Sequence, residues 1–283
     1  MTNILTVYLL IALGCSALTH AFFWYESASG PHRQYLERLS HGRTAWWILR
    51  GIFTGFASLL LVTVFFPLGF LRSFRSPSSS GDGRLPPVIL VHGLYHNASA
   101  WVFYRRWLRR SGFTTLFPFD YPSFGTSFEE ILERLDRFVG EVESRNPGSK
   151  PIMIGHSLGG LLCRAWADAP GNGERIQAVV TLGAPHGGSK LAALSVGRLG
   201  RSLIYGGPLF TKLENRRAPA GSRRLAVYSP MDTMVLPFEA LKIDDPGWTL
   251  LEVEPVGHVA LLFHPATARR VVDYLLEVTK AAR

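Results

Sequence analysis

A chain of 283 residues can hold one large α/β domain together with further segments. Hydrophobic residues make up 47% of it and charged residues 18%, so it is more apolar than an average soluble protein. Its net charge of +9 suits an anionic membrane surface or a nucleic acid, but it has no zinc-finger spacing, RRM-type aromatic pattern or basic repeat. We therefore expect a membrane as a partner and no nucleic acid.

Two runs without a charged residue lie near the N-terminus, at 4–25 and 51–71. Each exceeds the roughly 18 apolar residues that a helix needs to cross a bilayer. The segment between them is polar, and aromatic residues gather at both of its edges, where an interfacial belt would lie. These features predict a two-helix transmembrane hairpin, with helices at about 4–25 and 46–71, as a membrane anchor over residues 1–75.

Other interpretations of the two apolar runs are weaker. A signal peptide opens with a basic residue, and the first 32 residues contain no lysine or arginine. Residues 12–15 resemble a lipoprotein cleavage site, but the apolar run continues ten residues beyond Cys15. The second run could be a buried core helix, although its length and its position before a linker favour a span.

The arginines give a weak indication of orientation. Counted with Arg50, the segment between the runs carries four arginines, and the stretch after the second run carries three. Basic residues are retained on the cytoplasmic side of a membrane. Together with the uncharged N-terminus, the difference favours a cytoplasmic connection and an extracytoplasmic position for the large domain.

Residues 76–87 are rich in serine, glycine and proline and predict a linker, so that the folded domain covers 88–283. Apolar runs in this domain predict strands, and segments with a period of 3.6 residues predict helices. Strands that alternate with helices are typical of a mainly parallel sheet covered on both faces. The strands are expected at 88–91, 114–118, 151–154, 178–182, 224–228 and 249–253, and the helices at 105–110, 127–145, 161–167 and 271–278.

The segment 155–159, Gly-His-Ser-Leu-Gly, fits the G-x-S-x-G pattern between a predicted strand and a predicted helix. The turn is so tight that side chains two residues before and after the serine would clash, which explains Gly155 and Gly159. A Gly/Ser-rich loop is the alternative, but the flanking strand and helix favour a nucleophilic role for Ser157. Asp232 and His258 follow later strands, so all three residues are expected at the carboxyl edge of the sheet.

Five motifs follow one another along the domain. They are His92-Gly93-Leu94, the serine segment 155–159, Gly183-Ala-Pro-His-Gly-Gly-Ser189, Ser229-Pro-Met-Asp232 with Val235 and Pro237, and Gly257-His258. Together they resemble the motifs of bacterial lipases and esterases of the α/β-hydrolase superfamily, of the triacylglycerol-lipase-like kind, and the resemblance covers most of residues 86–278.

The resemblance implies an α/β-hydrolase fold and a catalytic triad. Ser157 would be the nucleophile, His258 the base, and Asp232 the acid that orients the histidine. The backbone N–H groups of Leu94 and Leu158 would form the oxyanion hole. The acid has alternatives, which are Asp120, Asp168, Asp244 and Asp245.

The predicted function is a serine hydrolase that cleaves carboxylic esters, with lipid acyl esters as the substrate class. A thioesterase, an amidase or an acyltransferase would use the same triad, and a non-catalytic lipid- or partner-binding protein is a further alternative. Residues 187–222 are expected to form either a lid over the site or an ordinary helix with its loops. No metal-ligand cluster or nucleotide fingerprint occurs, so we expect no metal and no cofactor. We expect a multi-pass protein of a bacterial inner membrane, and the sequence predicts no oligomeric state.

Overall fold

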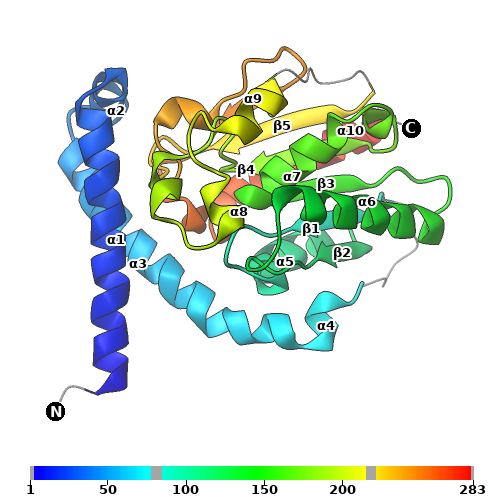
Figure 1. Ribbon diagram of the computed structural model, residues 1–283, viewed down its shortest axis with the longest axis horizontal. Helices are drawn as coiled ribbons and strands as arrows, with labels where there is room; N and C mark the ends of the chain where they lie inside the picture. The colour runs from blue at the N-terminus through cyan, green and yellow to red at the C-terminus, as the bar shows by residue number, and fades with distance from the viewer. Residues whose placement is uncertain (1–2, 78–84, 215–220, 282–283) are drawn as a thin grey trace.

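The computed structural model describes residues 3–77, 85–214 and 221–281 (Figure 1). Most of the predicted linker 76–87 and part of the segment 187–222 lie outside the described residues. The described residues after 84 form a sheet with helices on both faces, which we call the α/β domain. The described residues before 78 form the N-terminal helices.

All strands of the α/β domain run parallel, in the order β2-β1-β3-β4-β5-β6. The central strands are buried at every position, as expected for continuous apolar runs that are covered on both faces. The mainly parallel sheet is thus confirmed, and the strand ends differ from those expected by no more than two residues. The strands are β1 Val88–Val91, β2 Leu116–Phe119, β3 Ile152–His156, β4 Ala178–Leu182, β5 Arg223–Tyr228 and β6 Thr249–Glu252.

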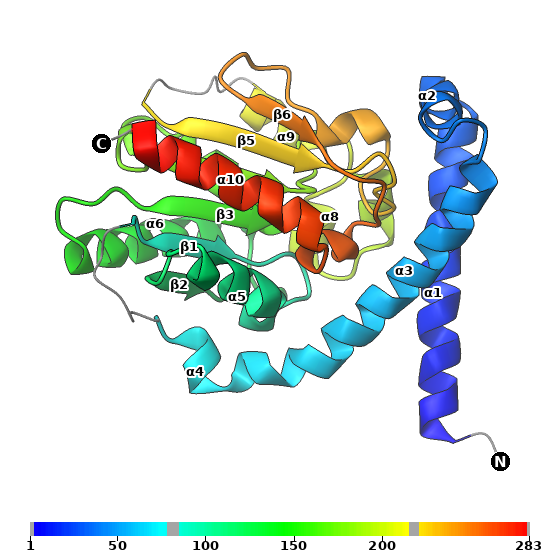
Figure 2. The ribbon, with the colours of Figure 1, turned by 180° about the vertical axis from the view of Figure 1, so that it is seen from behind.

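Alternate residues of each strand pack against different helices. Ile89, Met153 and Val179 share one core cluster with α6 Phe128–Arg145 and α7 Leu158–Ala167. Their neighbours on the opposite face share a second cluster with α5 Val102–Arg110 and α10 Pro265–Ala281. Figure 1 shows α6 and α7 in front of the sheet, and Figure 2 shows α5 and α10 in front of it. The order of the strands reverses between β1 and β3, where the chain has crossed from one side of β1 to the other.

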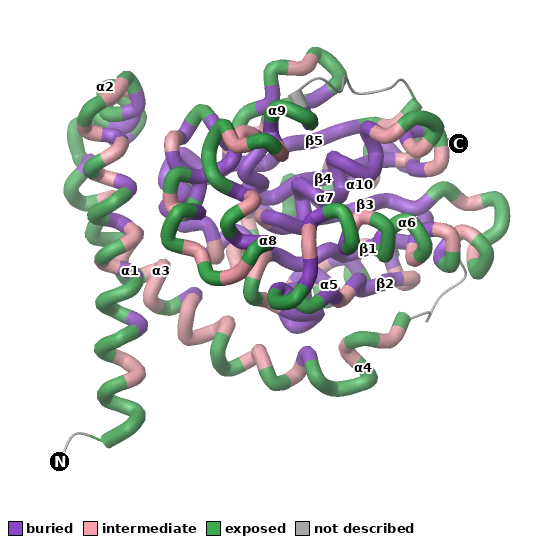
Figure 3. Tube along the Cα trace, viewed as in Figure 1, coloured by how far each residue is buried: buried purple, intermediate pink, exposed green. Residues whose placement is uncertain are grey.

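The N-terminal helices are α1 Ile4–Ala28, α2 Pro31–Leu39 and α3 Thr44–Phe65, followed by the 3-10 helix η1 Phe66–Phe70 and the short α4 Arg72–Arg75. Two segments, α1 and α3 with η1, are long and apolar enough to cross a membrane. Figure 3 shows that both are mainly exposed or half-buried, in contrast to the sheet. The connection between them was expected to be simply polar, and it contains α2.

Close packing joins α1 to α3. The Ser16 hydroxyl donates to the carbonyl of Ile52 over 2.7 Å. A Cβ atom at Gly55 would lie 2.6 Å from the same hydroxyl oxygen, so the absence of a side chain allows the two helices to approach.

The connection between these helices contacts the α/β domain. The His32 ring stacks on the Phe238 ring, with centroids 4.0 Å apart. The Tyr35 hydroxyl donates to Glu252, and Glu26 in the last turn of α1 pairs with Lys190 over 2.6 Å. These contacts differ from the arrangement favoured by the arginine distribution, in which a bilayer separates the connection from the domain.

Candidate active site

Ser157 occupies a sharp turn between β3, which ends at His156, and α7, which begins at Leu158. Its φ of 54° and ψ of −124° are strained for a residue with a side chain. A Cβ atom at Gly155 would lie 2.3 Å from the carbonyl oxygen of Gly159, and one at Gly159 would lie 2.1 Å from that of Val91. Only glycine fits at these two positions, which explains the local sequence.

His258 and Asp232 form a hydrogen-bonded pair at the same edge of the sheet. Asp232 follows β5, and His258 directly precedes the 3-10 helix η6 Val259–Leu262. The distance from His258 Nδ1 to Asp232 Oδ2 is 2.7 Å, and both side chains are buried. The other carboxylate oxygen accepts the backbone N–H groups of Met234 and Val235. A proton on Nδ1 that is donated to Asp232 leaves Nε2 as the nitrogen able to accept a proton.

Gly183, directly after β4, allows this pair to approach the backbone. A Cβ atom there would lie 3.0 Å from Asp232 Oδ2 and 3.1 Å from His258 Nδ1. Its φ of +57° also favours glycine. The motif that begins at Gly183 was noted in the sequence, but this spatial role was not predicted.

Ser157 and His258 line one mainly apolar cavity of about 230 Å³. Within the described residues, no hydrogen bond joins the serine hydroxyl to the histidine ring. Such bonds are often long before a substrate binds and shorten in the complex. The cavity is further lined by Gly93, Leu94, His156, Leu191, Leu203, Val259, Leu262 and, from α3, Leu59 and Val62.

The two backbone groups expected at an oxyanion hole are near this serine. Leu94 lines the cavity, and a Cβ atom at Gly93 would lie 3.1 Å from the Cβ of Ser157. Leu158 is the first residue of α7, so its N–H has no carbonyl one turn earlier in that helix.

Residues 88–232 match the family model of the alpha/beta hydrolase family. This chain belongs to the alpha/beta hydrolase family. Three solved structures share the fold of this hydrolase at low sequence identity. They are a monoacylglycerol lipase from Paleococcus ferrophilus (21% identity, 69% of this chain and 96% of that one covered, TM-score 0.52), the Bacillus licheniformis lipase BlEst2 in its mature form (18%, 71% and 96%, 0.58) and Aspergillus fumigatus lipase B (16%, 69% and 54%, 0.62). No curated protein matches the chain.

His156 contacts both the ring and the backbone of His258. Its ring centroid is 4.7 Å from that of His258, and its Nε2 lies 3.2 Å from the His258 carbonyl, so an N–H there would donate to it. Burial, with the nearby His258 as a smaller cause, holds the pKa of His156 well below the usual range. A neutral His156 can therefore position the backbone of His258 without placing a charge beside it.

The alternative acids have other partners. Asp120 accepts the N–H of Ala98, pairs with Arg75 over 2.8 Å and lies 3.3 Å from His92 Nε2. Burial acts to raise its pKa, but the hydrogen bond to His92 and the charges nearby outweigh this effect and lower it. Asp168 pairs with the buried Arg224 and with Arg164. Asp244 and Asp245 line a different cavity, which Ser157 does not line.

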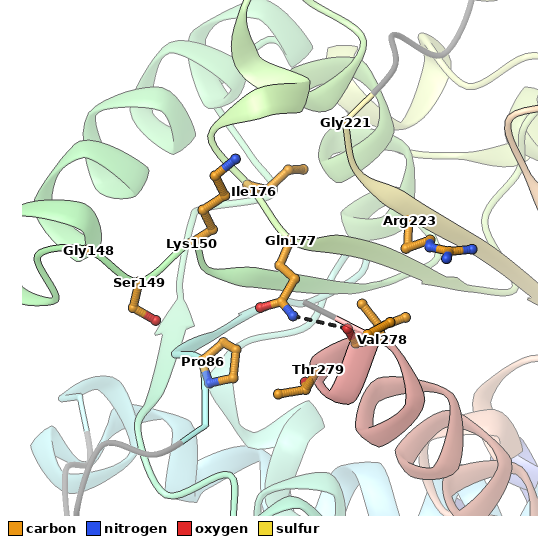
Figure 4. A pocket seen from close by; sticks show the side chains of 11 residues that line it. Pro86, Gly148, Ser149, Lys150, Ile176, Gln177, Gly221, Arg223, Val278 and Thr279 are labelled. Carbon is orange, nitrogen blue, oxygen red and sulfur yellow. Dashed lines mark hydrogen bonds between the residues drawn. The ribbon is translucent and has the colours of Figure 1, made fainter. Parts of the chain in front are cut away.

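A second hollow, of about 550 Å³, lies at the opposite edge of the sheet (Figure 4). Its lining includes Lys150, Gln177 and Arg223, at or just before the amino ends of β3, β4 and β5, and Gln177 donates to the carbonyl of Val278. Ligands of such sheets bind beyond the carboxyl ends of the strands, so the cavity at Ser157 is the candidate functional site. Among the described residues, no group of three or more His, Cys, Asp or Glu could hold a metal ion.

The sequence did not indicate that Leu59 and Val62 line the cavity. They belong to α3, which composition assigned to a membrane anchor. An apolar run of this kind has apolar residues on every face, so no periodicity marks the face that contacts the α/β domain.

Proposed function

We propose that this hydrolase is a serine esterase that cleaves carboxylic esters, with lipid acyl esters as its substrate class. The observation that carries the proposal is that His258, which is hydrogen-bonded to the buried Asp232, lines one apolar cavity together with the strained Ser157. The family and the lipases of the same fold support hydrolysis of esters in general. The apolar lining supports an acyl chain as the part of the substrate that is bound.

In the proposed reaction, the Ser157 hydroxyl oxygen attacks the ester carbonyl carbon while its proton passes to His258 Nε2. Asp232 stabilises the resulting imidazolium. The N–H groups of Leu94 and Leu158 donate to the oxyanion of the tetrahedral intermediate. The carbon–oxygen bond to the leaving alcohol then breaks, and His258 protonates that alcohol. Water attacks the acyl-serine with His258 again as the base, which releases the acid and restores the serine.

The other segments of the chain would attach the site to a membrane and cover it. Residues 1–75 would attach the enzyme to a membrane, 76–87 would link them to the catalytic domain 88–283, and part of 187–222 would cover the cavity. Leu191 and Leu203 line the cavity, which supports a covering role for this segment. Attachment would raise the effective concentration of lipid at the site without tight binding.

Hydrolysis of p-nitrophenyl esters by the purified full chain tests the proposal. The wild type is expected to release p-nitrophenol, and Ser157→Ala is expected to lower kcat by about a thousandfold or more. Ser195→Ala removes a hydroxyl that lines the same cavity, so it is the matched control, with an expected change below about threefold. A Ser157→Ala protein with the wild-type kcat would refute the proposal.

A further inference from the structure

The cavity at Ser157 has one wall from outside the α/β domain. Leu59 and Val62 are three residues apart on α3 and therefore lie on one face of that helix. They line the cavity together with Leu262 of η6, four residues after His258.

This wall is fixed to the domain at both ends. Near the start of α3, Trp47 and Ile48 pack against the buried cluster of Phe23, Leu36, Met231 and Leu236, two members of which flank Asp232 along the chain. At the other end, the Phe65 ring meets the Phe103 ring edge-on at 5.5 Å. The Asn97 side-chain amide donates to the carbonyl of Phe66 over 3.1 Å. Thus α3 is held against the domain at both ends and lines the cavity between them, unlike a flexible tether.

The opposite face of the same helix is apolar and exposed. Phe53 is 59% exposed and Val64 is 69% exposed, and they are three helical turns apart on one face. No charged residue occurs between 51 and 71. The neighbouring α1 also exposes apolar side chains, among them Leu10 and Ile11. A surface of this length and composition fits the hydrocarbon region of a bilayer, and the two helices have the lengths that such a region requires.

We propose that α3 is both the lipid-contacting surface and one wall of the acyl path, so that the acyl chain of a bilayer lipid reaches Ser157 laterally, past Leu59 and Val62. The inference rests on the proposed esterase function. A lateral path keeps the acyl chain in apolar surroundings from the bilayer to the cavity, so no methylene group has to enter water. Leu59 and Val62 then determine the preference between long and short acyl chains.

The test compares two valines of α3 in the full chain. Val62→Trp narrows the cavity, whereas Val64→Trp makes the same change on the exposed face. With p-nitrophenyl palmitate, Val62→Trp is expected to lower kcat/KM at least tenfold, because the larger side chain occupies the space that the long acyl chain needs. With p-nitrophenyl acetate, the expected change is less than about threefold. Val64→Trp is expected to change neither value by more than about threefold.

A second variant covers the case in which the tryptophan prevents folding. Val62→Ala widens the cavity, and it is expected to change the palmitate-to-acetate ratio of kcat/KM at least threefold. Labelling by a fluorophosphonate reports an intact site in each variant. Equal losses on both esters in a labelled Val62→Trp protein, or an unchanged ratio in Val62→Ala, would overturn the inference alone. A wild type that hydrolyses neither ester would overturn the proposed function and this inference with it.

Discussion

The strands of the α/β domain and the N-terminal helices are both rich in apolar residues, but they bury them to different extents. Every residue of β1, β3 and β4 is buried. In α1 and α3, large apolar side chains such as Leu10, Phe53 and Val64 are exposed. Apolar surface that the chain does not cover itself needs another apolar partner. The domain thus covers its own apolar side chains, whereas the apolar side chains of the helices are covered only in contact with such a partner.

The two regions also differ in chemistry. The buried pair of His258 and Asp232 and the strained Ser157 belong to the domain, whereas the helices contribute apolar lining. In the proposed function, the domain therefore carries out the reaction, and the helices determine where the enzyme is located and how the substrate reaches the site. Variants that change catalysis without membrane binding, or membrane binding without catalysis, test this division of roles between the two regions.

The largest expected effect belongs to the domain alone. Asp232→Asn is expected to lower kcat by about ten-thousandfold, because the amide no longer holds His258 in the useful tautomer. Attachment to liposomes should not change. Asp120→Asn is the matched control, and since Asp120 contacts His92 and Arg75, its expected loss is below about tenfold. A larger loss in Asp120→Asn than in Asp232→Asn, measured with p-nitrophenyl butyrate, would reassign the acid.

The next effect belongs to the helices alone. The double variant Phe53→Arg with Val64→Arg places two charges on the exposed face of α3. An arginine in the hydrocarbon region costs up to about 2.5–3.5 kcal/mol, so binding of the double variant to liposomes should fall more than about a hundredfold. Hydrolysis of p-nitrophenyl acetate should be unchanged. Leu250→Arg, on the exposed part of β6, serves as the control and should leave flotation with liposomes unaltered. Undiminished flotation of the double variant would contradict the lipid-contacting role.

A smaller effect concerns the contact between the two regions. Burial first, and then the charge of Lys242, lower the pKa of His32 to about 4. Because the folded pKa is below the unfolded value of about 6.5, the neutral ring stabilises the folded state above pH 6.5. This contribution is lost as the pH falls towards 4. The free energy of unfolding should therefore fall by about 2 kcal/mol more in the wild type than in His32→Phe between pH 7.5 and 5.

Urea unfolding in mild detergent at the two pH values measures this difference. Tyr35→Phe retains the histidine and removes the hydroxyl that donates to Glu252, so it should keep the wild-type pH dependence. Equal pH dependence in the wild type and His32→Phe would show that the pKa of His32 does not differ between the folded and the unfolded state.

The smallest expected effect is no difference at all. The contacts of α2 place the connection and the α/β domain together, so both should lie on the same side of a membrane. In a Cys15→Ser background, whose remaining Cys163 is buried, the exposed cysteines introduced one at a time by Gln34→Cys and Lys150→Cys should react with an impermeant maleimide from the same side. Labelling from opposite sides of membrane vesicles would mean that α2 does not contact the α/β domain when the protein is in a bilayer.

The sequence was sufficient to predict the sheet, since buried parallel strands are continuous apolar runs that few other elements imitate. It also indicated the edge where Ser157, Asp232 and His258 lie, because parallel strands end together. The short α2 was not predicted, although Pro31 after Gly30 is a typical start of a helix. Sequence alone could not indicate the contact of α3 with the site, because it depends on which face of a uniformly apolar helix meets the domain.

Mapping of a fluorophosphonate adduct by mass spectrometry tests the central claim, that Ser157 is a nucleophile activated by His258, most directly. The account predicts one modified peptide, which contains Ser157, and at least a hundredfold slower modification in His258→Ala. An adduct on another residue, or an undiminished rate in His258→Ala, would contradict the account.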